Sequence, residues 1–174
     1  MENVEDLLSF IRDVPDFPKE GIIFKDITPV LMNPDAFKFA IDSMAKPFEN
    51  EEIDLVVGIE ARGFITAASL AYKLGAGLVL VRKPGKLPWE KESATYELEY
   101  GTDTLEIHKD AINPDMNVVI ADDLIATGGT GKACIELIEK VGGKVHALSF
   151  LIELAFLNPR ENLADYTIHS VITY

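Results

Sequence analysis

The sequence predicts an α/β fold with a central, mostly parallel sheet flanked by helices. From residue 54 onward, short apolar runs alternate with segments that have a helical hydrophobic period. The apolar runs lack polar alternation, as expected for parallel strands that helices cover on both faces. Such segments form βαβ units with right-handed crossovers. A chain of 174 residues has the length of one ordinary domain, so we expect a single domain over residues 1–174.

Two helices are predicted before the alternating part begins. The first is ended by Pro15 and Pro18, and the second begins near Pro34 and ends near Pro47. Each carries apolar residues at the spacing of one helix face, which indicates one buried side. These residues are Val4, Leu7, Leu8 and Ile11 in the first helix, and Phe37, Ala40, Ile41, Met44 and Phe48 in the second.

The predicted strands of the sheet follow in order. They are DLVVGI at 54–59, GLVLV at 77–81, NVVIA at 117–121 and KVHALSFLIEL at 144–154. A helix over 63–74 joins the first two strands, and a helix from about Thr130 joins the last two. The second of these helices ends at Gly142 and Gly143 after an apolar stripe. That stripe consists of Cys134, Leu137, Ile138 and Val141.

Residues 83–109 interrupt this alternation. The segment is polar, holds two prolines and is too long for a plain connection between core strands. Alternating Tyr96, Leu98 and Tyr100, followed by Gly101 and then by apolar residues, suggest a hairpin that leaves the sheet. A long excursion of this kind often acts as a lid over a site.

The composition limits the classes of partner. The formal net charge is −13, whereas nucleic acids and anionic membranes bind proteins that have an excess of positive charge. The first ten residues are acidic where a secretion signal is basic, and no stretch approaches the roughly 20 apolar residues of a membrane span. Cys134 is the single cysteine of the sequence, which fits a reducing compartment. We therefore expect a cytoplasmic protein that binds small molecules.

The segment Val118–Thr130, VVIADDLIATGGT, carries the clearest chemistry. Its loop follows a buried strand, at the sheet edge where open α/β proteins bind ligands. Gly128 and Gly129 let backbone amides turn inward, and Thr127 and Thr130 add hydroxyl donors. Together with the following helix N-terminus, this loop can hold a phosphate.

A tight turn with a threonine cap is the structural alternative for this loop. The neighbouring carboxylates of Asp122 and Asp123 favour a ligand site, because two acids at the end of an apolar strand are costly without a partner. Ribose hydroxyls beside a bound phosphate would be suitable partners. If the pair is extended, its side chains point to opposite faces and should contribute unequally.

The string VVIADDLIATGGT resembles the phosphoribosyl pyrophosphate motif of the type I phosphoribosyltransferases. Further segments resemble the adenine-specific members of this family, so that the resemblance covers most of the chain. They are FPKEGIIFKDITPVL at 17–31, VVGIEARGF at 56–64, VRKPGKLP at 81–88 and LEYGTDTLEIHKDAI at 98–112. The resemblance implies transfer of 5-phosphoribose to N9 of adenine, giving AMP and pyrophosphate. It also implies magnesium, held mainly by the phosphates of the substrate.

The resemblance assigns the phosphate groups to two parts of the chain. The stretch from Ala126 to Thr130 holds the 5′-phosphate, and Asp122 and Asp123 lie along the ribose hydroxyls. The turn Glu60, Ala61 and Arg62 receives the pyrophosphate, often across a cis peptide. A cation beside a helix N-terminus is disfavoured unless an anion binds there, which supports this role for Arg62.

Arg82, Lys83 and Lys86 form the densest cationic cluster of the sequence. A solvated charge run is the plain alternative, but guanidinium and ammonium groups are good pyrophosphate donors. In the family, the residue that matches Arg82 reaches the site of the partner subunit. The resemblance therefore implies a homodimer.

The base and the lid complete the implied site. Within an N-terminal hood in residues 1–33, Phe24 stacks on the purine and the backbone near Lys25 reads its edge. Many relatives have arginine at the position of Lys25. Glu99, beside Tyr100 on the lid, matches the glutamate over the purine and could take the N9 proton or face the charge that develops on the ribose. Glu97 competes for this role.

Two alternatives to an adenine-specific enzyme stay open. One is a sibling transferase for hypoxanthine, guanine or xanthine, although backbone groups matched to a 6-amino purine would mispair with a 6-oxo purine. The other is a regulator that senses phosphoribosyl pyrophosphate without catalysis. A regulator of that kind needs a nucleic-acid-binding surface, which the acidic composition argues against.

Overall fold

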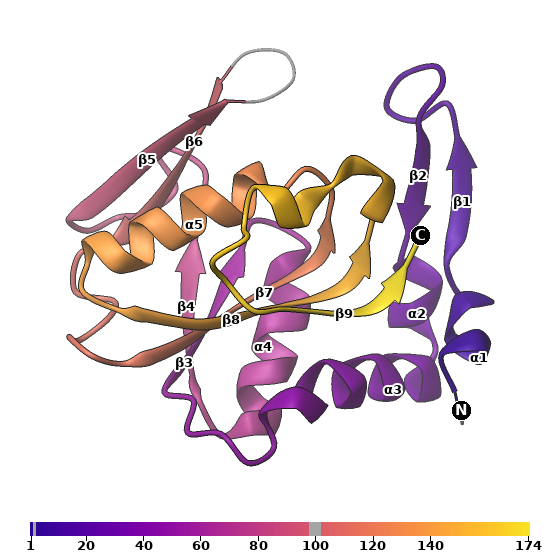
Figure 1. Ribbon diagram of the computed structural model, residues 1–174, viewed down its shortest axis with the longest axis horizontal. Coiled ribbons are helices and arrows are strands. Elements are labelled where there is room, and N and C mark those ends of the chain that lie inside the picture. The colour runs from indigo at the N-terminus through magenta and orange to yellow at the C-terminus, as the bar shows by residue number, and fades with distance from the viewer. Residues whose placement is uncertain (2, 98–101) are drawn as a thin grey trace.

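A parallel sheet with helices on both faces forms the centre of the protein (Figure 1). The computed structural model describes residues 1, 3–97 and 102–174. The sheet has five strands in the order β4-β3-β7-β8-β9, all parallel to their neighbours. Their bounds are β3 Leu55–Ile59, β4 Gly77–Val81, β7 Asn117–Ile125, β8 Lys144–Glu153 and β9 Ile168–Thr173. The predicted α/β class and parallel sheet are confirmed.

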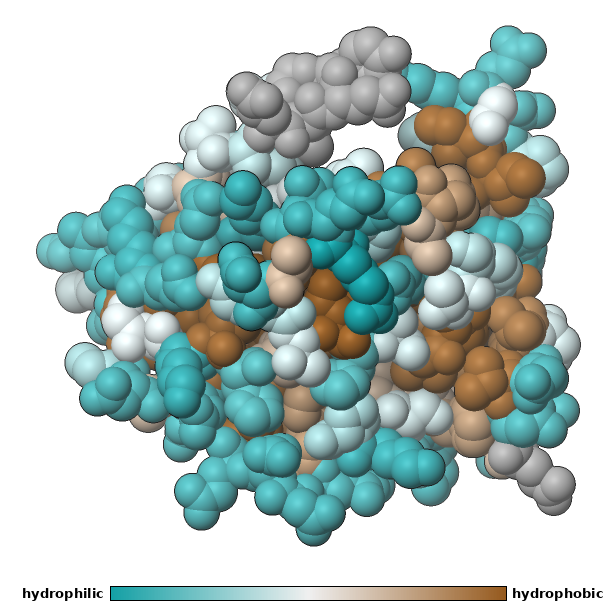
Figure 2. Space-filling view, in the orientation of Figure 1, coloured by the Kyte–Doolittle hydropathy of each residue, from teal (hydrophilic) through white to brown (hydrophobic). Residues whose placement is uncertain are grey.

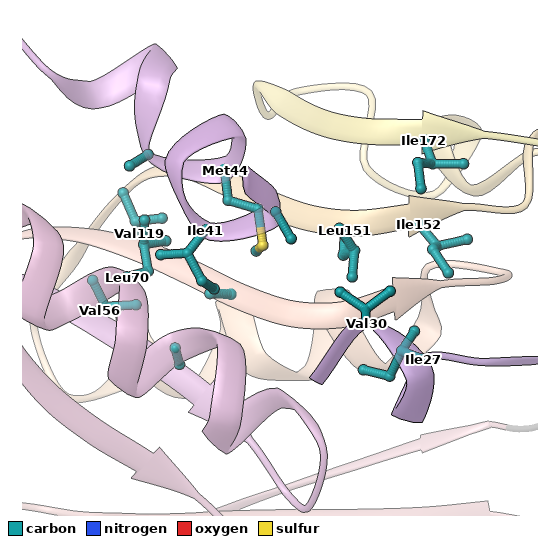
Figure 3. Packing of buried hydrophobic residues seen from close by; sticks show 14 of the residues in the cluster. Ile27, Val30, Ile41, Met44, Val56, Leu70, Val119, Leu151, Ile152 and Ile172 are labelled. Atoms are coloured by element: carbon teal, nitrogen blue, oxygen red, sulfur yellow. The ribbon is translucent and has the colours of Figure 1, made fainter. Parts of the chain in front are cut away.

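Two hydrophobic clusters hold these layers together. One joins a face of the sheet to α3 (Pro34–Ala45) and α4 (Gly63–Leu74), and the other joins the opposite face to α5 (Gly129–Lys140). In Figure 3, Ile41 and Met44 of α3 and Leu70 of α4 lie against apolar side chains of the strands. Burial on both faces explains why β3, β7 and β8 read as largely apolar runs, whereas the apolar edge strand β4 leaves Leu78 and Leu80 exposed.

The N-terminal helices agree with the sequence pattern in part. Ala40, Ile41 and Met44 of α3 are buried as expected, and the 3₁₀ turn η1 (Lys46–Phe48) continues the helix. The first helix, α1 (Val4–Leu8), is shorter than predicted, and Leu7 is its buried residue. Extending its stripe to Ile11 was wrong, because the chain turns after Leu8 and enters a strand at Arg12.

A small hairpin that the hydrophobic pattern did not indicate follows α1. Strands β1 (Arg12–Pro15) and β2 (Ile23–Asp26) pair antiparallel, and α2 (Thr28–Met32) returns the chain to the core. The brown surface at the upper right of Figure 2 lies over this hairpin. Phe17, Ile22 and Ile23 are exposed there. Because both strands are short and contain no buried residue, they leave no clear alternation in the sequence.

The hairpin predicted within residues 83–109 is present and is anchored at its base. Strands β5 (Lys91–Glu97) and β6 (Thr102–His108) pair antiparallel in a sheet of their own. Leu105 and Ile107 are fully buried in the cluster under α5, although the segment is polar overall. The hairpin is therefore an outgrowth of the core.

The two hairpins β1–β2 and β5–β6 extend beyond the same edge of the central sheet (Figure 1). The carboxyl ends of β3 and β7 lie at that edge, where parallel sheets bind ligands. Two short turns, η2 (Ala155–Leu157) and η3 (Pro159–Glu161), follow β8. None of the helices within the described ranges is long and apolar enough to cross a membrane.

Candidate active site

Two adjoining cavities lie at the carboxyl ends of β3 and β7. The smaller, of about 210 Å³, is enclosed by the loop from Ala126 to Gly131. The larger, of about 420 Å³, extends from the turn at Glu60–Arg62 to the hairpin β5–β6. Asp122 and Thr130 line both cavities. The structure thus places the predicted phosphate loop beside the predicted pyrophosphate turn.

The loop around the smaller cavity depends on a glycine. Gly128 precedes α5 with φ +86°, a left-handed conformation that other residues adopt at a cost. A Cβ at this position would lie 2.8 Å from the carbonyl oxygen of Pro159. Asn162 braces the loop by donating from Nδ2 to the Thr127 carbonyl at 2.7 Å. The first residues of α5 line the smaller cavity, and the unpaired amides of a helix N-terminus suit an anion.

The adjacent aspartates have different surroundings. Strand β7 continues through both residues, so the pair is extended. Asp123 is only 4% exposed, and its Oδ2 lies 2.7 Å from Nε of Arg62. Asp122 fits against Gly63, where an added Cβ would lie 2.5 Å from Oδ1. Burial and the neighbouring Asp123 raise the pKa of Asp122 well above its ordinary value.

The turn after β3 connects the aspartates to the hood. The peptide between Glu60 and Ala61 is cis. Besides its ion pair with Asp123, Arg62 lies with its guanidinium 4.8 Å from the centre of the Phe24 ring. Phe24 packs edge-on against Phe17, with ring centres 5.2 Å apart. Arg62, itself in the predicted pyrophosphate turn, therefore contacts both the predicted base residue Phe24 and the predicted ribose residue Asp123.

The cationic cluster is organised by Glu60. Its carboxylate accepts hydrogen bonds from Arg82 Nη2 at 3.2 Å and from the Lys83 amide at 2.9 Å. These donors lower the pKa of Glu60. The ammonium of Lys83 contacts the carboxylate of Asp103 and lines the larger cavity. Lys86 is exposed, and its carbonyl accepts from Arg82 at 3.4 Å.

The side chain of Lys25 has partners of its own. Its Nζ lies 2.7 Å from Asp13 Oδ1 and 3.7 Å from the centre of the Tyr174 ring. Phe24 and Lys25 are neighbours on β2, so their side chains point to opposite faces. The Lys25 side chain is consequently occupied away from Phe24.

Comparison with known proteins decides the family. The model of the phosphoribosyl transferase domain matches residues 30–165. An adenine phosphoribosyltransferase of Pseudothermotoga lettingae is 56% identical over 97% of this chain and 99% of its own. The chain belongs to the adenine phosphoribosyltransferase family.

Solved structures of the family agree with this fold. The adenine phosphoribosyltransferase of Thermoanaerobacter pseudethanolicus superposes with a TM-score of 0.97 at 54% identity, covering 99% of this chain and 100% of that one. The Saccharomyces cerevisiae protein, solved with adenine and an imino-altritol bisphosphate, gives a TM-score of 0.91 at 42% identity, covering 97% of both chains. Each of these solved chains is matched almost from end to end.

Sequence reasoning missed residues that build this family site. Tyr96 lines the larger cavity, and Asn162 holds the loop from Ala126 to Thr130. The sequence motifs of the family segments do not include Asn162, which lies 35 residues from its partner Thr127. Glu99 and Tyr100, predicted on the lid, lie outside the described residues.

Proposed function

We propose that this chain, as an adenine phosphoribosyltransferase, transfers 5-phosphoribose from phosphoribosyl pyrophosphate to N9 of adenine. The products are AMP and pyrophosphate. The carrying observation is that Asp122 and Thr130 line both adjoining cavities, so that a ligand bound at these two residues touches both. A phosphate in the smaller cavity would leave the ribose at the aspartates and the pyrophosphate at the turn after β3.

The proposed phosphate contacts follow from the charges around the cavities. The 5′-phosphate is held by the amides and hydroxyls from Ala126 to Thr130, at the positive end of the α5 dipole. The pyrophosphate is held by Glu60–Arg62 backbone groups and by Arg62, whose guanidinium is 2.7 Å from Asp123 in the free protein. Lys83 lines the same cavity. Arg82 and Lys86, the other predicted pyrophosphate contacts, do not line this cavity, and Arg82 is bonded to Glu60.

The chemical step breaks the bond between C1′ and the pyrophosphate oxygen, and the electron pair leaves with pyrophosphate. N9 of adenine bonds to C1′ and its proton departs. Asp122 and Asp123 hold the ribose hydroxyls and face the positive charge that develops on the sugar. Glu99 of the lid is the proposed acceptor of the N9 proton, with Glu97 as the competing carboxylate. Tyr100 is proposed as a neighbouring substrate contact.

Magnesium is the proposed cofactor. Asp122 and Asp123, two of the three carboxylates that line the larger cavity, suit magnesium, which takes few protein ligands alongside substrate phosphates. No cluster of three or more His, Cys, Asp and Glu side chains that could hold a metal occurs among the described residues. When bound, magnesium would neutralise charge on the leaving pyrophosphate. The substrate would supply most of its ligands.

Base selection is proposed to rest on Phe24 and on the backbone beside it. The ring, held by Phe17, offers a flat apolar surface for a purine. Because the Lys25 ammonium is paired with Asp13, the backbone of β2 is left to read the base edge. Backbone donors and acceptors have fixed positions, which favours a 6-amino over a 6-oxo purine.

We also propose a homodimer in which Arg82 reaches the partner's site. Strand β4 is an edge of the sheet, and Leu78 and Leu80 expose 43% and 38% of their surface. Arg82 continues this row of alternate residues beyond the strand. The adjacent helix α4 adds Ile65 and Tyr72, exposed by 40% and 91%. A second copy of the chain would cover this apolar face.

Two further proposals concern the whole chain. Residues 1–174 form one phosphoribosyltransferase domain with a hood in residues 1–33 and a lid in residues 83–109, since both hydrophobic clusters share the central sheet.

A cytoplasmic location is proposed because Cys134, the single cysteine, is a buried free thiol compatible with a reducing compartment.

Pyrophosphate release tests the proposed function. The full chain is incubated with phosphoribosyl pyrophosphate and magnesium, and with adenine, hypoxanthine or guanine in separate reactions. We expect rapid release with adenine and little with either 6-oxo purine. Absence of release with adenine would refute the reaction, and faster release with hypoxanthine or guanine would favour the sibling activity. Omitting magnesium should abolish release.

A further inference from the structure

We propose that the hydroxyl of Tyr96, on the hairpin β5–β6, is a further binding group for the 5′-phosphate of the substrate. The inference deepens the proposed function and rests on it. It adds a contact from the hairpin to a phosphate otherwise held by the loop from Ala126 to Thr130. The two hydrogen-bond partners of the Tyr96 hydroxyl support this contact.

The Tyr96 hydroxyl lies between the phosphate loop and the hairpin. Thr130 Oγ1 donates to it at 3.4 Å, and it donates to Asp103 Oδ2, also at 3.4 Å. Thr130 and Tyr96 both line the larger cavity, and Thr130 also lines the smaller one. A phosphate oxygen bound to the Thr130 hydroxyl would therefore lie within reach of Tyr96.

Both hydrogen bonds of the Tyr96 hydroxyl are long. Hydroxyl-to-oxygen bonds in proteins are usually about 2.5–3.0 Å, so bonds of 3.4 Å leave the hydroxyl weakly engaged. A phosphate oxygen is a stronger acceptor, because charge-assisted bonds are shorter and roughly twice as strong as neutral ones. When Tyr96 turns to phosphate, Asp103 still keeps its ion pair with Lys83.

The ring of Tyr96 is held in a position from which its hydroxyl can bond to phosphate instead of Asp103. It packs on the hydrophobic cluster beneath α5, and Asp103 is its direct partner across the hairpin. Helix α5, whose residues belong to this cluster, also begins at the loop from Ala126 to Thr130. The Tyr96 ring and the loop are therefore positioned by the same helix. A hydroxyl held near its binding position loses little entropy when the ligand arrives.

The test compares ligands with and without a phosphate. Binding of AMP and of adenosine to the full chain is measured by calorimetry for the wild type and Tyr96→Phe. We expect the Kd of AMP to rise about tenfold, the effect of losing a hydrogen bond to a charged group. The Kd of adenosine should stay within twofold of the wild-type value, since adenosine has no phosphate to lose.

Tyr166→Phe is the matched control. The Tyr166 hydroxyl donates to Glu139 at 2.7 Å, and Tyr166 lines neither cavity. Its loss should leave the affinity for both ligands unchanged. Unaltered AMP binding by Tyr96→Phe, or an equal loss for AMP and adenosine, would overturn the inference. If the wild-type protein released no pyrophosphate with adenine, both the proposed function and the role of Tyr96 would be refuted. If the wild type is active, a negative binding result refutes only the role of Tyr96.

Discussion

Replacing Gly128 by alanine should weaken both the fold and the phosphate site. At φ +86°, an L residue costs about 1–2 kcal/mol relative to its ordinary conformations. The added Cβ would also lie 2.8 Å from the Pro159 carbonyl oxygen, a backbone atom that cannot rotate away. Overpacking of this kind costs about 1–3 kcal/mol. The free energy of unfolding should therefore fall by about 2–5 kcal/mol.

Gly75→Ala separates the two contributions. Gly75 ends α4 with φ +69°, and a Cβ there would meet nothing within 4 Å. This control should lose only the conformational part, about 1–2 kcal/mol. Urea denaturation of both variants gives the free energies, and each is compared with the wild type in the same buffer.

Steady-state kinetics test the functional half of the prediction. Relief of the Gly128→Ala clash must move the proposed phosphate loop, so kcat/KM for phosphoribosyl pyrophosphate should fall about tenfold to a hundredfold. Gly75→Ala should keep wild-type kinetics. Equal stability losses in the two variants would refute the clash, and unchanged kinetics in Gly128→Ala would refute the assignment of the smaller cavity to phosphate.

Three further predictions concern charge, the base and the dimer. Because the folded pKa of Asp122 is raised, its ionised form destabilises the fold as pH rises through that pKa. Asp122→Asn should therefore raise Tm at pH 7 and lower kcat. The gain in Tm should vanish below pH 3.8, the ordinary pKa of the carboxyl, and a gain independent of pH would contradict this. Lys25→Arg should change kcat/KM for adenine by less than about threefold, because the ammonium faces Asp13; a larger loss would place the side chain on the base. Leu80→Glu should shift the protein from dimer to monomer in sedimentation velocity, and an unchanged dimer would move the interface elsewhere.

The local sequence was sufficient to predict strands in which burial of apolar side chains decides the structure. Strands β3, β7 and β8 could be predicted because helices cover both their faces, which makes each strand a continuous apolar run. The hood strands β1 and β2 could not, because each has only four residues and none of them is buried. Edge strand β9 was missed because only two of its residues are buried.

For the site, the sequence by itself determined which residue types each segment offers, and these predict glycines and threonines for phosphate, two aspartates for ribose, and cations for pyrophosphate. Parallel strand order also placed these segments at one edge of the sheet. Only the tertiary structure decided the partners. It pairs Arg62 with Asp123 and Arg82 with Glu60, and brings Tyr96 to Thr130 from 34 residues away. Such pairs depend on packing between elements, which no local pattern encodes, and they show which of the two unequal aspartates faces Arg62.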